Sequence, residues 1–104
     1  MLNQCILVGR LVSDPVLVTE PDGTVKSEVT LAIQRGYKND TTGEYDTDHI
    51  KITLWSGIAE NTVQYCKANS TVGVKARLSN EGDIIEVIAE KITFINTEGD
   101  GYDS

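Results

Sequence analysis

The stretch ILVGRLV, Ile6–Val12, lies within the longer segment NQCILVGRLVSDP that runs from Asn3 to Pro15. Its apolar residues predict a β-strand, yet a Gly beside an Arg is unusual in the interior of a strand. Glycine inside a strand permits a bulge, a bend or the close approach of another backbone. Gly9 therefore predicts a sharply curved strand, and Arg10 predicts that one face of this strand meets a negatively charged partner.

The rest of the chain is dominated by apolar residues that alternate with polar ones, which is typical of short β-strands. Turn residues such as Pro21, Asp22 and Gly23 separate these runs, and Gly82 is placed for a tight turn. Five strands and one short extended piece are expected, at Leu2–Val12, Val16–Thr19 (the short piece), Val25–Arg35, His49–Trp55, Thr71–Ser79 and Ile84–Ile95.

Two segments interrupt this alternation. The polar stretch Gly36–Asp48 is expected to be a long loop, and long ordered loops in compact domains are often functional. The stretch 56–70 carries apolar residues near the helical period, with Ser56 as the N-cap and Glu60 in the first turn. Five strands with a single helix between the third and fourth predict an all-β, five-stranded OB-fold barrel. Gly9 and Gly73 are the candidates for its bends.

Length and composition predict one small domain without catalytic or metal chemistry. With 104 residues, we expect one domain over 1–96 and a short flexible acidic tail over 97–104. The chain has no 18-residue apolar run and no signal peptide, which predicts a cytoplasmic protein without a membrane partner. Cys5, Cys66 and the lone His49 have no zinc spacing, so free thiols and no metal or cofactor are expected. No catalytic motif is present, so the chain is not expected to be an enzyme.

The net charge of −7 argues at first against nucleic acid as a partner, but the charges are unevenly placed. Only Glu28, Glu86 and Glu90 among sixteen acids fall clearly in predicted strands, whereas seven of nine bases do. A locally basic sheet surface could attract phosphates. The alternative is that these cations are ordinary soluble surface, or protect a sheet edge. The seven bases are Arg10, Lys26, Arg35, Lys51, Lys75, Arg77 and Lys91.

Aromatic residues accompany these cations. Trp55 shares the face of Lys51 by alternation, and Tyr37 follows Arg35. Exposed aromatic rings on a basic surface can stack on unpaired bases. Trp55 could equally be a half-buried packing residue at the junction between strand and helix, and His49 could stack or simply lie on the surface.

Four stretches of the sequence carry a family resemblance. They are MLNQCILVGRLVSDPVL, PDGTVKSEVTLAIQR, HIKITLWSGIAENTVQYCK and STVGVKARL. Together they resemble the bacterial and phage single-stranded DNA-binding protein family over Met1 to Phe94. The resemblance implies an OB barrel and a homo-oligomer, for which a tetramer is favoured and a dimer stays open. It also implies that single-stranded DNA wraps over the barrel, with its bases stacked on aromatics and its phosphates paired with Lys and Arg.

Carried onto this sequence, the resemblance implies stacking by Tyr37 and Trp55. His49 stands where the family usually has Phe or Trp, and Arg10 matches the Gly-Arg of the first strand, as a phosphate partner or an intersubunit contact. The candidate nucleic-acid-binding residues are Arg10, Arg35, Tyr37, His49, Lys51, Trp55, Lys75 and Arg77. The predicted function is sequence-independent binding that coats and protects single-stranded DNA in replication, recombination or repair.

Two departures from the family leave alternatives open. The hairpin SNEGD replaces a long basic loop with a stacking aromatic, which predicts a smaller footprint and lower affinity. The end of the chain, EGDGYDS, is acidic but brief, although the family uses such an end to recruit replication and repair proteins. One alternative is a primosomal-type OB-fold adaptor that acts as a dimer through protein contacts. Another is an enzyme that uses the paired carboxylates Asp46 and Asp48, which have no partner His or metal-ligand spacing.

Overall fold

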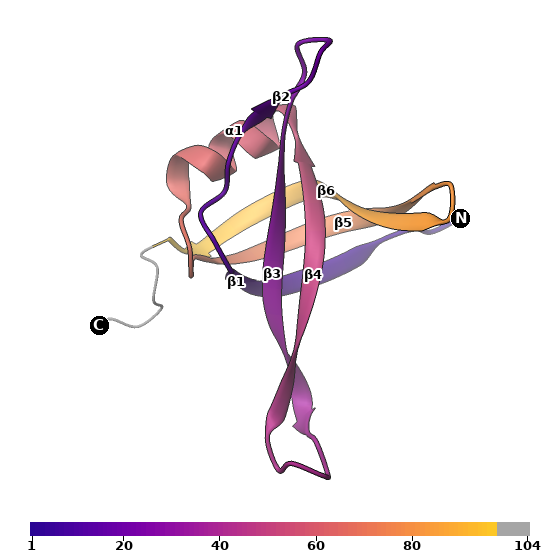
Figure 1. Ribbon diagram of the computed structural model, residues 1–104, viewed down its shortest axis with the longest axis vertical. Coiled ribbons are helices and arrows are strands. Elements are labelled where there is room, and N and C mark those ends of the chain that lie inside the picture. The colour runs from indigo at the N-terminus through magenta and orange to yellow at the C-terminus, as the bar shows by residue number, and fades with distance from the viewer. Residues whose placement is uncertain (98–104) are drawn as a thin grey trace.

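Five long strands form the wall of a closed barrel in the computed structural model, which describes residues 1–97 (Figure 1). A sixth, two-residue strand is added to the edge. The elements are β1 (Cys5–Leu11), β2 (Val18–Thr19), β3 (Val25–Lys38), β4 (Tyr45–Trp55), α1 (Ser56–Tyr65), β5 (Thr71–Glu81) and β6 (Ile84–Asn96).

The strand order around the wall is β1-β5-β6-β4-β3, and a pairing between β1 and β3 closes the circle. All neighbours are antiparallel except β4 and β6, which pair in parallel where Thr53 lies opposite Ile88. The single helix of the described residues lies between β4 and β5. This connectivity confirms the predicted OB-fold.

The barrel closes at Gly9. β1 pairs with β5 from Cys5 to Arg10, and it pairs with β3 only at Arg10 and Leu11. A Cβ atom at Gly9 would lie 2.6 Å from the carbonyl oxygen of Ala32 and 2.8 Å from a side-chain carbon of Ile33. Only glycine therefore lets β1 come this close to β3. Gly73, the other candidate bend, has no such constraint, because a Cβ there would meet its nearest neighbours at 3.6 and 3.8 Å.

Inward-facing residues of all five wall strands fill the barrel, and α1 covers one end of it through Ala59 and Thr62. The alternation in β3 and β4 gives each strand an apolar inner face. The buried apolar residues are Leu11, Val29, Leu31, Ile52, Leu54, Ala59, Cys66, Val72, Val74, Ala76 and Ala89. Cys66 is buried and Cys5 partly buried, both as free thiols, and burial raises the pKa of the Cys66 thiol.

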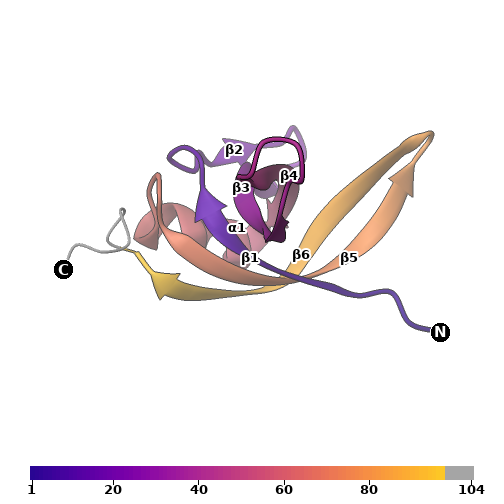
Figure 2. The same cartoon turned by 90° about the horizontal axis from the view of Figure 1, so that it is seen from below.

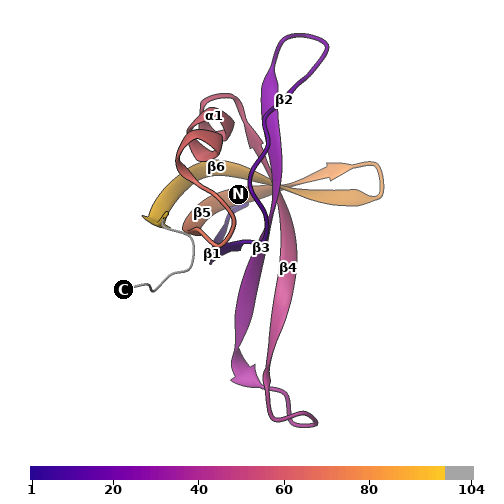
Figure 3. The ribbon, with the colours of Figure 1, turned by 60° about the vertical axis from the view of Figure 1, so that its left-hand side comes forward.

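The expected long loop over Gly36–Asp48 is wrong, because most of it is strand. β3 and β4 continue beyond the barrel as a two-stranded arm, and only residues 39–44 connect them. The pairing shifts register between Gln34 and Lys38, so that Lys38 lies opposite Tyr45. Figure 3 shows this β3–β4 arm and the β5–β6 hairpin leaving the barrel in different directions. Both faces of the arm are largely exposed, so no apolar alternation marked it in the sequence.

Further differences from the sequence analysis concern the ends of elements and one exposed side chain. β1 begins at Cys5 instead of Leu2, and α1 ends at Tyr65 instead of continuing to residue 70. Trp55, not Ser56, is the N-cap residue, and it makes no side-chain cap; Ser56 has a φ of 52°. Leu78, near the end of the predicted strand Thr71–Ser79, is 44% exposed because β5 has already left the barrel there.

The β5–β6 hairpin projects from the barrel on the side where the chain begins (Figure 2). Gly82 has a φ of 65°, which confirms the predicted tight turn at its tip. The Asn3 side chain ties the start of the chain to this hairpin. Its amide nitrogen donates to the Leu78 carbonyl at 2.8 Å, and its oxygen accepts the Leu78 N–H at 2.9 Å.

Substitution of Gly9 by Ala is expected to lower the free energy of unfolding by about 1–3 kcal/mol, because the added methyl group overlaps the β3 backbone. Urea denaturation at equal protein concentration measures this. Gly73→Ala is the matched control, with a change within about 1 kcal/mol in either direction. Equal stability of the two variants would contradict the role given to Gly9.

Candidate nucleic-acid interface

Cations and an aromatic residue line the outer face of β1, β3 and β4. Alternation along β4 points His49, Lys51 and Trp55 away from the core. Register places His49 beside Ala32 and Trp55 beside Lys26 on β3, and Ala32 also lies opposite Arg10 of β1. We call the group Arg10, Lys26, His49, Lys51 and Trp55 the β4 surface. It joins four of the eight predicted site residues on one face of the barrel.

Trp55 lies half-buried at the end of β4, where the helix begins. The Lys26 ammonium lies over its ring, 5.5 Å from the ring centroid, and this ammonium also pairs with Glu20 at 3.3 Å. A cation over an indole ring is electrostatically favourable. The half-burial of Trp55 at this junction fits the packing interpretation, and stacking on a base stays a prediction.

Arg35 is held within the β3–β4 arm. Its guanidinium donates to the Asp48 carboxylate with contacts of 2.9 and 3.1 Å, and Asp46 lies 3.9 Å away. This hydrogen bonding lowers the pKa of Asp48 and raises the pKa of Arg35. The ion pair neutralises Arg35, so the residue does not add a free positive charge to the surface. Tyr37, two residues along β3, is 64% exposed.

Lys75 and Arg77 lie apart from the β4 surface. Register places Lys75 between Ile6 of β1 and Lys91 of β6, on the wall formed by β1, β5 and β6. Arg77 lies near Glu90, with 3.8 Å between Nε and Oε2. The cations of the predicted basic sheet surface are therefore divided between two walls of the barrel and the β3–β4 arm.

Acidic residues are also more frequent in the strands than the sequence indicated. Asp46, Asp48 and Glu81 were expected in loops and belong to β4 and β5, because both hairpins are longer than predicted. Within residues 1–97, Arg10 and Lys51 are the β4-surface cations that form no ion pair. The positive character of the interface is therefore concentrated at these two residues.

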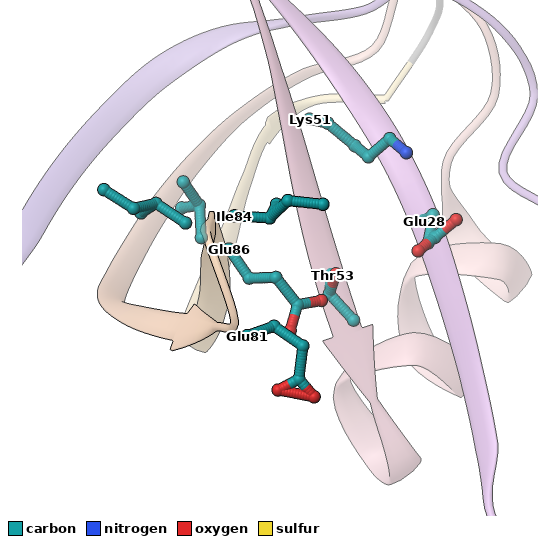
Figure 4. Close-up of a pocket in the computed structure, with 8 residues that line it drawn as sticks. Glu28, Lys51, Thr53, Glu81, Ile84 and Glu86 are labelled. Atoms are coloured by element: carbon teal, nitrogen blue, oxygen red, sulfur yellow. The ribbon is translucent and has the colours of Figure 1, made fainter.

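A pocket that sequence reasoning missed lies between β4 and the β5–β6 hairpin (Figure 4). It depends on a contact between strands that are distant in the chain, so no local signal could reveal it. Its lining combines apolar side chains with carboxylates and one lysine. The lining residues are Glu28, Lys51, Thr53, Glu81, Ile84, Ile85, Glu86 and Val87.

Other kinds of site find little support in the described part of the chain. Residues 1–97 contain no group of three or more His, Cys, Asp or Glu side chains that could hold a metal ion. Asp46 and Asp48, the carboxylates of the enzymatic alternative, both face Arg35 in the arm. No helix among the described residues has the length and apolar character needed to cross a membrane.

Comparison with known proteins agrees with this geometry. The profile of the Single-strand binding protein family matches residues 2–95. The chain is 40% identical to single-stranded DNA-binding protein B of Bacillus subtilis, over 92% of each chain. It is 38% and 37% identical to the single-stranded DNA-binding proteins of Halalkalibacterium halodurans and Bacillus cereus.

These alignments include 95% and 97% of this chain but only 64% of each of the latter two relatives, which are longer proteins. The match includes β1 with Gly9, the β3–β4 arm, the β5–β6 hairpin and the whole of the β4 surface. The chain belongs to the single-strand binding protein family.

Proposed function

We propose that this protein binds single-stranded DNA without sequence preference along most of its contact, and that the β4 surface is the primary contact. The observation that carries the proposal is the register across three strands. It aligns Arg10, Ala32 and His49 in one row, with Lys51 and Trp55 further along β4. Ala32, the small residue at the centre of the row, leaves room for a DNA strand to lie between Arg10 and His49.

Each group on this surface has a separate task. Arg10 and Lys51, which have no ion-pair partner within residues 1–97, hold phosphates. Trp55 and His49 offer ring surfaces to bases, and Tyr37 on the arm extends the stacking surface. The protein catalyses no reaction, because occupation of phosphates and base faces is enough to keep strands unpaired.

The remaining predicted residues form a second contact. Lys75 and Lys91 lie in register on β5 and β6, and Arg77 follows on the same face of β5. A strand that wraps around the barrel would reach them after it leaves the β4 surface. Arg35 contributes less, because its charge is already satisfied by Asp48.

The protein acts as a homo-oligomer. Along Cys5–Val8, one edge of β1 pairs with β5 and the other has no strand partner within residues 1–97. Ile6 and Val8 on this strand are 67% and 53% exposed. An exposed apolar edge strand is a template for another strand, and a second copy would satisfy it through a two-fold axis. We favour a tetramer over a dimer, since the apolar face continues to Ile95, which is 56% exposed.

In the cell, this activity serves replication, recombination or repair in the cytoplasm, and replication or repair proteins are possible further partners. Residues 1–96 form the DNA-binding domain. The proposed acidic tail over 97–104 lies almost wholly outside the described residues. The adaptor alternative is less well supported, because the relatives compared above are named for binding single-stranded DNA.

Lys51→Ala is expected to weaken binding of oligo(dT) at low salt and to reduce the slope of log affinity against log salt by about one, since one phosphate contact is lost. Emission of Trp55, the single tryptophan, reports the binding. Lys67→Ala removes an exposed lysine beyond α1 and serves as the control. Unchanged Trp55 emission with oligo(dT) and no shift in a gel would contradict the proposed function.

Asp48→Asn is expected to strengthen binding of oligo(dT) several-fold, because it removes a negative charge and releases Arg35 from its ion pair. Glu60→Gln on α1 removes one negative charge away from the β4 surface and is the charge-matched control. Titration at one fixed salt concentration compares them, and an equal gain in both variants would mean that only total charge matters.

Ile6→Asp is expected to reduce the oligomer to a smaller species, because a carboxylate cannot be buried against a second copy. Light scattering after size-exclusion chromatography measures the mass. Val16→Asp is the control, since Val16 is 64% exposed but lies outside β1. The wild-type mass in Ile6→Asp would rule out this face as the interface.

A further inference from the structure

The pocket between β4 and the β5–β6 hairpin differs in chemistry from the rest of the DNA-facing surface. Its volume is about 220 Å³, and Lys51 is one of its lining residues. Ile84 and Ile85 form its apolar wall and are 67% and 63% exposed, which is unusual for isoleucine. Glu81 and Glu86 line the same wall. Carboxylates repel a phosphate, so an occupant from a DNA strand would have to be a base.

Thr53 adds a polar side chain to this lining. The residue is only 4% exposed, and it lies on β4 opposite the hairpin. In Figure 4 the Glu86 side chain reaches from the hairpin toward Thr53, while Glu81 lies below it. Lys51 and Glu28 come from the opposite side, on β4 and β3. A polar group is thus set at the base of a pocket with acceptors on its walls.

We propose that this pocket receives one nucleobase of the bound strand and favours a base with an exocyclic amino group. The proposal rests on the proposed function and refines it at a single position. The Ile84 side chain, which shares a face of β6 with Glu86, covers one face of the base, and the Glu86 carboxylate accepts a hydrogen bond from the amino group of the base. Lys51 at the rim of the pocket holds the neighbouring phosphate. The base therefore enters the pocket, while the sugar-phosphate backbone stays outside it.

Cytosine and thymine show the expected discrimination, because they are of similar size. Cytosine presents an amino donor at N4, which an ionised carboxylate accepts. Thymine presents the O4 acceptor at the same place, and two acceptors repel each other. Bases elsewhere along the β4 surface contact aromatic rings and cations. These contacts do not distinguish one base from another, because they do not form hydrogen bonds with the base edge. The pocket therefore adds a local preference to binding that is otherwise independent of sequence.

Glu86→Gln tests the proposal, because an amide of the same size can also donate to O4 of thymine. Fluorescence anisotropy would measure Kd for labelled dC and dT oligonucleotides of equal length, with wild type and variant. The ratio of Kd for dT to Kd for dC is expected to fall about fivefold in Glu86→Gln. Glu60→Gln, which removes the same charge from α1, is expected to leave the ratio unchanged.

The outcomes separate this inference from the function on which it rests. A fall in the ratio confined to Glu86→Gln supports the pocket as a base site. If wild type binds both oligonucleotides and the ratio is the same in both variants, the pocket inference is overturned while the proposed function stands. If wild type binds neither oligonucleotide, the proposed function fails and this inference fails with it.

Discussion

Contact between the backbones of β1 and β3 closes the barrel, and every functional position depends on it. β1 changes partners at Arg10, from β5 to β3, and the absence of a side chain at Gly9 permits the change. The same crossing places Arg10 in register with Ala32 and, through it, with His49. One steric requirement therefore sets both the closure of the fold and the row of residues across the β4 surface.

The barrel was predictable because each of its strands has one buried face. Alternation in Val25–Arg35 and His49–Trp55 predicted the inner and outer positions correctly. Gly9, which the sequence singled out in the first strand, lies where β1 meets β3 and the barrel closes. The β3–β4 arm and the β5–β6 hairpin were less predictable, because a two-stranded ribbon in solvent has no face that must be apolar. Asp46 and Asp48 therefore looked like loop residues, although they belong to β4 and neutralise Arg35.

The candidate site was predictable to a similar degree. His49, Lys51 and Trp55 could be grouped from one strand, since alternation alone decides their face. The separation of Lys75 and Arg77 from them depends on strand order around the barrel, and the pairing of Arg77 with Glu90 depends on cross-strand register. The local sequence determines neither the strand order nor the cross-strand register. The pocket walled by Glu86 requires both hairpins to be placed in space, so it was missed entirely.

The hydrogen bonds between Asn3 and Leu78 have a practical consequence. They fasten the first residues of the polypeptide to the base of the hairpin that carries Glu81 and Glu86. Any extension fused ahead of Met1, such as a purification tag left in place, would begin close to the contact between Asn3 and this hairpin. Preparations of the protein with and without an N-terminal tag could then differ in their affinity for a polynucleotide.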